Sequence, residues 1–398
     1  MKDESRNWGA IGLIYAFTVL SMASVGIVIP LLGDLQTRLG VGQESLGLSV
    51  ALFSAPSAVL AGLGGGIVDR VGARGSLMVS ALISAAADVI AFGAPSLQLF
   101  DLAMLLAGVG FAGISIAAPA LIIGSSKGAH RVHAMSFWST YAPTGFSLGL
   151  YLAVPFAGTA IWPWAILLHG GLMLVALCFS GLLPHAASVP STEAHGAAGL
   201  SQLLSAFREV PILRLAVAAS LPSALAYGTS LVAPSYLTAL HGIGVGEASS
   251  IVAVTNLAMI PGGILAGQLL ARGTSSAPLF RMVVLAGIAA QIMFFIPSGG
   301  FALAVAALIV WPLAMGAAMA IAMTLLPAVI RDQRRSAAAS GVISQAISCV
   351  SFLAPPVYFA LLGGGGWVPF ILIAAVALGA SLLALPAASR RMGEVEAG

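Results

Sequence analysis

Long apolar segments recur along the whole chain and are separated by short polar gaps. A helix that crosses the roughly 30 Å hydrocarbon core of a bilayer needs about 20 mostly apolar residues. The predicted spans are 8–32, 45–68, 76–95, 99–124, 133–157, 161–183, 211–238, 247–271, 278–296, 299–326, 337–362 and 366–388. The pattern therefore predicts an all-α integral membrane protein with twelve transmembrane helices.

Nearly all basic residues fall on one side of the membrane when the polar gaps are numbered alternately. Of the 16 Lys and Arg residues, only Arg38 lies on the opposite side. The others are Lys2, Arg6, Arg70, Arg74, Lys127, Arg131, Arg208, Arg214, Arg272, Arg281, Arg331, Arg334, Arg335, Arg390 and Arg391. Short loops rich in Lys and Arg stay in the cytoplasm, so both termini are predicted to be cytoplasmic, in a bacterial inner membrane. Merging or splitting one span would reverse the side of every later loop, so the charge pattern also supports the span count.

Composition agrees with a membrane protein and excludes several other classes. Hydrophobic residues make up 59% of the chain and charged residues 7%, far from the balance of a soluble domain. The net charge of +3 reflects topology and contact with anionic lipid, and gives no reason to expect nucleic acid. Cys178 and Cys349 both fall in predicted spans, so no disulfide framework or metal cluster is expected. The first apolar run exceeds the core of a signal peptide and is expected to remain in the mature protein.

The spans divide into two halves. The longest polar gap, 184–210, leaves six spans on each side and is interpreted as a cytoplasmic linker. A short internal repeat supports the division: Gly64-Gly65 with Ala73-Arg74-Gly75 after span two recurs at the same spacing as Gly262-Gly263 with Ala271-Arg272-Gly273 after span eight. We therefore predict six-helix bundles at 1–183 and 211–398, joined by 184–210. Transporters built from parallel repeats bind their substrate near the bilayer midplane between the halves.

The stretch after span two carries a family resemblance. Gly65, Asp69, Arg70, Gly72 and Arg74 lie in a segment that resembles the G-x-L-x-D-R-x-G-R-R signature of the major facilitator superfamily. With the span count and the linker, the resemblance covers the whole chain. It implies two pseudo-symmetric bundles, a small organic substrate, a monomer, and neither an enzyme activity nor a cofactor. It also implies that these charged residues latch the cytoplasmic gate; the alternative is simple anchoring by positive charge on the inner face.

The chain departs from the family pattern at several positions. Ala73 replaces the first of the paired basic residues, and the second-half copy has Gly267 and Gln268 where Asp and Arg would stand. Efflux members often carry an Arg four residues before the glycine-rich run of span four, whereas Met104 occupies that position here. This difference weighs against a proton-antiport mechanism taken directly from those relatives.

Family architecture places spans one, four, seven and ten around a central cavity, so we searched each for side chains at helical spacing. The candidate lining residues are Tyr15, Thr18, Met22, Phe111, Ser115, Ser220, Ser223, Tyr227, Ser230, Trp311, Met315 and Met319. None is Lys or Arg, and a bound anion ordinarily needs a cation or a helix dipole nearby. A strongly anionic substrate is therefore disfavoured, and an apolar or weakly polar organic solute is favoured. The alternative for each residue is ordinary helix packing or an interfacial position.

Two ionisable residues lie well inside predicted spans. A rise of 1.5 Å per residue places Asp88 in span three and His169 in span six at a similar depth, roughly 10–12 Å from the outer end. The two side chains are therefore able to meet. An acid next to an imidazole forms a protonatable pair that suits coupling to a proton gradient. Because spans three and six are peripheral in the family, a structural tie between helices is the alternative.

Two enzyme-like motifs are rejected on context. Gly108, Gly110 and Gly113 match G-x-G-x-x-G but lie in an apolar helix with no preceding strand, so we interpret them as helix-packing residues. Gly145-Phe146-Ser147-Leu148-Gly149 matches a hydrolase nucleophile turn without its strand-to-helix context. The chain also has no G-x-x-x-x-G-K-[ST] loop. Energy for transport is therefore expected from a gradient and not from ATP.

These patterns predict a secondary transporter that works by alternating access. Efflux of a drug-like compound or metabolite is slightly favoured, because an aromatic, Met-bearing surface without cations suits adaptable apolar contacts. Uptake is the nearest alternative, since the stretch from Trp138 to Gly145 resembles the cyanate and nitroimidazole permeases. A receptor on a transporter fold is a further alternative. It is disfavoured because such proteins usually add a cytoplasmic output domain, and here only the linker and a short tail are available.

Overall fold

The computed structural model of the chain describes residues 7–60, 68, 71–184, 207–329, 336–364 and 366–386, and in these stretches the regular structure is helical. The helices of the first half are α1 (Trp8–Val28), α2 (Leu32–Leu39), α3 (Gln43–Leu60), α5 (Ala73–Gly93), α6 (Leu97–Ser125), α7 (Gly128–Trp138), α8 (Tyr141–Ala153) and α9 (Trp164–Cys178). Those of the second half are α11 (Val210–His241), α12 (Val245–Asn256), α13 (Met259–Ala271), α14 (Ser276–Phe295), α15 (Gly300–Thr324), α16 (Leu326–Val329), α17 (Ser336–Gly363) and α18 (Val368–Ala384).

A helix, or a pair of consecutive helices, overlaps each predicted span. Eight of the helical segments are long and apolar enough to cross a membrane by length and composition, and they include α12 and α13 taken together. Two shorter apolar helices, α9 and α18, add to them. The all-α, multi-pass membrane architecture is therefore confirmed. The exact number of crossings stays a prediction, as do the bundle boundaries, because the predicted linker falls mostly outside the described residues.

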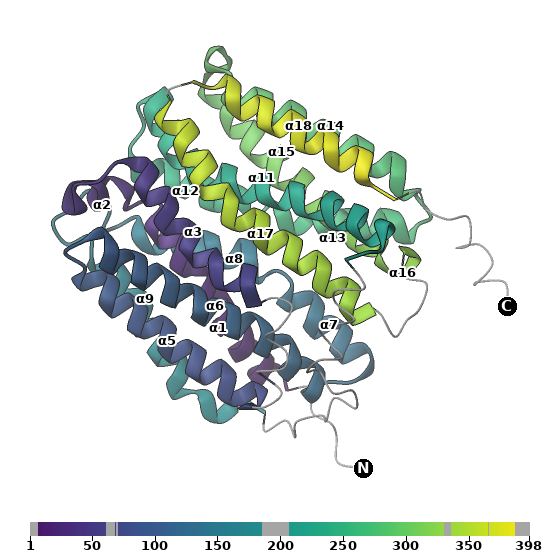
Figure 1. Cartoon of the computed structure of the whole chain (residues 1–398), viewed down its shortest axis with the longest axis horizontal. Coiled ribbons are helices and arrows are strands. Elements are labelled where there is room, and N and C mark those ends of the chain that lie inside the picture. Colours follow the sequence, from purple (N-terminus) through teal and green to yellow (C-terminus); the bar gives the residue numbers. More distant parts are fainter. Residues whose placement is uncertain are drawn as a thin grey trace.

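The helices pack into two groups, which Figure 1 shows as purple to blue ribbons beside teal to yellow ones. In the first group α5 packs on α6 and α9, and α1 packs on α8. In the second group α15 packs on α13 and α14, and α11 packs on α18. The main contacts between the groups are those of α3 with α17 and of α8 with α12. These helices belong to spans two, five, eight and eleven, the spans that meet across the halves in the major facilitator superfamily.

One of the two main contacts between the groups lies toward the predicted outer end. Spans five and eight contact each other through α8 and α12, which are their outer portions. Among the described helices, the inner portions pack within their own groups, α7 on α6 and α13 on α15. In the described residues, spans five and eight therefore contact each other at the end that we predict to be extracellular.

Glycine allows several helix pairs to approach until backbone touches backbone. A Cβ atom added at Gly145 or Gly149 of α8 would overlap a carbonyl oxygen of α1, and one added at Gly108 of α6 would overlap the Phe53 carbonyl of α3. Gly110 and Gly113 lie against serines of α5, which confirms that the G-x-G-x-x-G match is a packing motif. Lipid provides no hydrophobic force between helices, so such close contact supplies the cohesion.

Prolines interrupt spans five and eight, which the sequence predicted as continuous helices over 133–157 and 247–271. The breaks fall between Trp138 and Tyr141 and between Asn256 and Met259. Pro143 and Pro261 follow within one turn. A proline lacks an N–H donor and its ring collides with the carbonyl four residues earlier, which is where each helix stops. The continuous-helix prediction was therefore wrong at these two points.

We predict that a methyl group at Gly262 destabilises the protein while the same change at Gly267 does not. Both glycines lie in α13, but a Cβ at Gly262 would overlap the Leu313 carbonyl of α15, whereas Gly267 has nothing within 4 Å. Overpacking of this kind costs about 1–3 kcal/mol, so Gly262→Ala should lower the thermal unfolding midpoint in detergent. Gly267→Ala is the matched control, and equal midpoints for the two variants would contradict the packing assignment.

Candidate functional site

Four aromatic rings from four helices of the first group form a continuous cluster. The ring centroids of Phe53 and Phe111 are 5.0 Å apart, and those of Phe111 and Tyr141 are 6.5 Å apart. Trp138 follows, 5.0 Å from Tyr141. Separations of this size are those of interacting aromatic pairs. Since α3 and α8 also contact the second group, the cluster lies beside the junction of the two groups.

Tyr227 of α11 approaches α8 and α3, two helices that carry this cluster, from the second group. Its ring lies edge-on to Phe146 of α8, with centroids 6.5 Å apart, and its hydroxyl lies next to Ser54 of α3. On the first group, Ser115 of α6 lies next to the Tyr141 hydroxyl. We define the aromatic site as Phe53, Ser54, Phe111, Ser115, Tyr141, Phe146 and Tyr227. It combines aromatic surface with hydroxyl groups from both halves of the molecule.

The candidates on α1 face α7 and α8. The Tyr15 hydroxyl is hydrogen-bonded to the Thr140 hydroxyl at 2.8 Å and donates to that of Thr144 at 3.0 Å. Thr18 is fully buried and donates to a carbonyl of its own helix, and Met22 lies against Gly145. These three side chains therefore help to pack α1 on span five.

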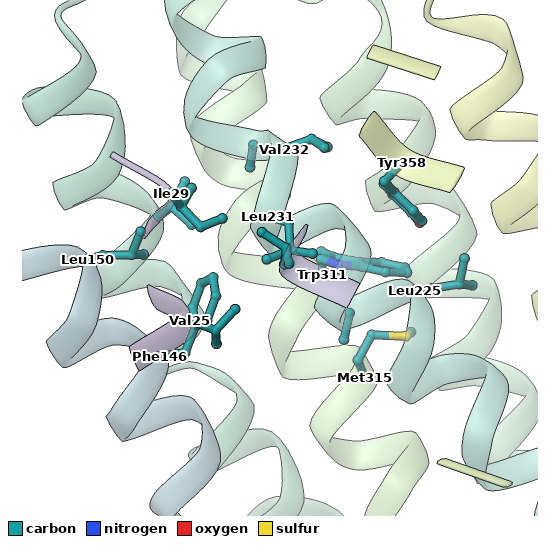
Figure 2. Packing of buried hydrophobic residues seen from close by; sticks show 14 of the residues in the cluster. Val25, Ile29, Phe146, Leu150, Leu225, Leu231, Val232, Trp311, Met315 and Tyr358 are labelled. Carbon is teal, nitrogen blue, oxygen red and sulfur yellow. The ribbon is translucent and has the colours of Figure 1, made fainter. Parts of the chain in front are cut away.

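The candidates on α15 lie in the interior of the second group. Trp311 and Met315 are each 2% exposed, and both approach Gly287 of α14. Figure 2 shows them among Leu225, Leu231 and Tyr358, while Phe146 lies with Val25, Ile29 and Leu150 on the other side of the view. Ser223 of α11 is half-buried, one turn before Tyr227. Of the predicted cavity residues, Phe111, Ser115 and Tyr227 thus belong to the aromatic site, whereas Trp311 and Met315 pack toward α14 within the same hydrophobic cluster.

Sequence reasoning did not select Phe53, Ser54, Tyr141 and Phe146. The search was confined to spans one, four, seven and ten, whereas these residues come from spans two and five. One signal was available: span five carries Phe137, Trp138 and Tyr141 within six residues before a proline, which is where its helix breaks.

Asp88 and His169 meet, as the depth argument predicted. His169 Nδ1 lies 2.8 Å from Asp88 Oδ2, and His169 Nε2 lies 2.7 Å from the Leu20 carbonyl oxygen of α1. Both side chains are buried, and in the part of the chain that the structure describes they are the only Asp, Glu, His, Lys or Arg residues in its buried core. The pair therefore connects α5, α9 and α1.

The partners of the imidazole define how many protons the pair holds. A carbonyl oxygen only accepts, so His169 Nε2 must carry a hydrogen and donate it to Leu20. One further proton is shared between His169 Nδ1 and the Asp88 carboxyl group, on either atom. In both arrangements the pair has no net charge, which a low-dielectric interior favours.

A small cavity of about 20 Å³ adjoins the pair. Its wall includes Ser24, Asp88, Phe100 and Met104, and the Ser24 hydroxyl has no hydrogen-bond partner within the described residues. A space of this size holds about one water molecule. The acid is therefore not sealed on all sides by apolar atoms.

The predicted cytoplasmic gate motif is only partly visible. Gly65, Asp69 and Arg70 lie outside the described residues. Gly72 has a φ of 86°, a left-handed conformation that glycine adopts without strain, and it precedes the first turn of α5. Arg74 donates to the Ser180 carbonyl at 3.1 Å, which connects the start of α5 to the end of α9. The latch itself stays a prediction.

A family model described as the Major Facilitator Superfamily matches residues 14–355. The chain belongs to this superfamily. Solved transporter structures share its fold: a bacterial homologue of the human lysosomal transporter Spinster in an inward-facing, unoccupied conformation has a TM-score of 0.75 at 17% identity, over 97% of this chain and 98% of that one. The nucleoside transporter NupG has a TM-score of 0.78 at 14% identity, over 95% and 100%.

One curated relative is similar over part of its length. The probable sulfoacetate transporter SauU of Cupriavidus necator is 25% identical over 159 residues, which are 40% of this chain and 33% of the relative. The matched region thus spans about a third of that protein. The superfamily assignment makes this chain a transporter of a small solute, and the solved structures share its fold.

We predict that Asp88→Ala lowers stability and that Asp88→Asn preserves it. Alanine leaves His169 Nδ1 buried without a partner, at a cost of roughly 1–3 kcal/mol. An asparagine amide can donate to a neutral Nδ1 while Nε2 still donates to Leu20. Thermal unfolding in detergent measures both variants; an Asp88→Ala midpoint equal to that of wild type would show that the pair does not hold the three helices together.

Proposed function

We propose that this superfamily member is a secondary transporter of the bacterial inner membrane that moves a small, uncharged or weakly polar organic solute by alternating access, as a monomer with both termini in the cytoplasm. The observation that carries the proposal is the aromatic site at the junction of the two helix groups. Aromatic faces provide stacking and dispersion, and the hydroxyls of Ser54, Ser115 and Tyr227 provide hydrogen bonds that fix orientation.

The chemistry of the site favours an uncharged solute. Neither the aromatic site nor the set of candidates from spans one, four, seven and ten contains a Lys or Arg. A carboxylate or sulfonate taken into this region would lose its hydration without gaining a charged partner. A planar molecule with one or two hydroxyl or amide groups meets complementary surface instead. We propose efflux as the direction of transport.

We propose a proton gradient as the driving force, with Asp88 and His169 as the proton site. Loss of the shared proton leaves the Asp88 carboxylate facing the lone pair of Nδ1. The imidazole relieves that contact only by moving its remaining hydrogen from Nε2 to Nδ1, which releases the Leu20 carbonyl. Deprotonation thus frees α1, a helix that the family places beside the substrate path, and this links proton release to helix movement.

We predict that Phe111→Ala weakens solute binding at least tenfold while Phe179→Ala leaves it unchanged. Phe111 lies at the centre of the aromatic site, whereas Phe179 is 57% exposed at the end of α9. A thermal-shift screen of neutral aromatic compounds, nucleosides and sulfoacetate against purified protein would identify a ligand. Binding of sulfoacetate with no neutral ligand would overturn the proposed solute class.

We predict that Asp88→Asn abolishes flux driven by a pH gradient but retains exchange of labelled for unlabelled solute. The amide cannot release a proton, yet it preserves the contact with His169. Everted membrane vesicles with an acidic interior should accumulate the solute if transport is outward; accumulation only in right-side-out vesicles would indicate uptake. Gradient-driven flux that persists in Asp88→Asn would remove the pair from the coupling mechanism.

A further inference from the structure

Asn256, which sequence reasoning did not single out, makes three hydrogen bonds to two other helices. It is the last residue of α12 and is 5% exposed. Its Nδ2 donates to the Pro143 carbonyl at 3.3 Å and to the Ser147 hydroxyl at 3.4 Å, both on α8 of the first group. Its Oδ1 accepts from the Ser230 hydroxyl of α11 at 3.3 Å. One carboxamide therefore joins the two groups and also contacts α11.

The position of Asn256 coincides with the breaks in both spans that it joins. Helix α12 ends at Asn256 itself, where span eight breaks. Pro143, whose carbonyl accepts the hydrogen bond, lies in the first turn of α8 after the break in span five. Toward the predicted extracellular side of this point, α8 and α12 pack on each other. Toward the other side, among the described helices, α7 and α13 pack on their own groups. Asn256 thus marks the inner limit of the contact between spans five and eight.

The same residue is close to the aromatic site along α11. Ser230, the donor to Asn256 Oδ1, lies three residues after Tyr227 on that helix, so the two side chains share a face. A solute that moves Tyr227 or the backbone around it therefore acts on a helix that is hydrogen-bonded to Asn256.

A second carboxamide occupies the other helix pair that joins the groups. Gln345 of α17 donates through Nε2 to the Ala58 carbonyl of α3. Each of the two main contacts between the groups thus contains an amide donor on a backbone carbonyl of the opposite group. Each amide reaches its carbonyl only when the two helices have the register that the structure shows. If the bond breaks, lipid offers no water to replace the donor on that carbonyl.

We propose that Asn256 is the positioning residue that holds the outer ends of spans five and eight together, and that its hydrogen bonds to Pro143 and Ser147 must break for the transporter to open outward. The proposal rests on the alternating-access function above. Its test measures opening without any solute, so it fails or succeeds independently of the solute class and of proton coupling.

The experiment places a reporter cysteine at Val154, which lies against Gly246 of α12 at the outer end of the contact. In a background with Cys178 and Cys349 replaced by Ala, Val154→Cys is labelled with a polar maleimide in nanodiscs, and the labelling rate reports outer opening. Asn256→Leu removes all hydrogen bonds at similar volume, and Asn256→Asp keeps the acceptor for Ser230 while removing both amide donors. Interhelical hydrogen bonds in membranes have strengths that correspond to about 3- to 15-fold changes in an equilibrium.

We expect Asn256→Leu and Asn256→Asp to raise the labelling rate by that factor. The matched control is Ser230→Ala, which removes the bond within the second group and leaves both bonds to α8, so its rate should equal that of the parent. Ser147→Ala, which deletes one acceptor, should give a smaller increase and provides the test if the Asn256 variants do not fold. An unchanged rate in folded Asn256→Asp and Ser147→Ala proteins, or an equal increase in Ser230→Ala, would overturn the proposal.

Discussion

Lipid supplies the helices neither with hydrogen bonds nor with a hydrophobic force that drives them together. The helix contacts and helix breaks of this structure reflect that constraint. Helices cohere where glycine lets backbone atoms touch, as between α1 and α8 and between α13 and α15. Where the backbone is interrupted, as at Pro143 and Pro261, the break lies inside the protein and polar side chains lie beside it. The close glycine contacts and the helix breaks thus involve the same few helices.

Polar side chains are few in this interior, so each one fixes a specific contact between helices. The pair of Asp88 and His169 has no net charge, and its hydrogen bonds connect α5, α9 and α1. Asn256 and Gln345 place amide donors on carbonyls of the opposite group. The first pair holds helices of one group together, whereas the two amides connect helices of different groups.

Several residues of the aromatic site could be predicted from the sequence, but the way in which they come together could not. Phe111, Ser115 and Tyr227 were identified because helical spacing and the family resemblance placed them on helices around the path. Phe53 and Tyr141 were missed since they come from spans two and five, and Trp311 was grouped with the others although its ring packs on α14. Helical periodicity gives a face but not the rotation of that helix against its neighbours, and only packing decides which faces meet.

The sequence by itself determined the membrane class, the helical segments and the possibility of contact between Asp88 and His169, because hydrophobic length and rise per residue are properties of the chain alone. Tertiary structure decided that the contact occurs and that Leu20 completes it. It also decided where spans five and eight break and that Asn256 joins them there. Those features depend on distances between residues far apart in the chain, which only the packed helices fix.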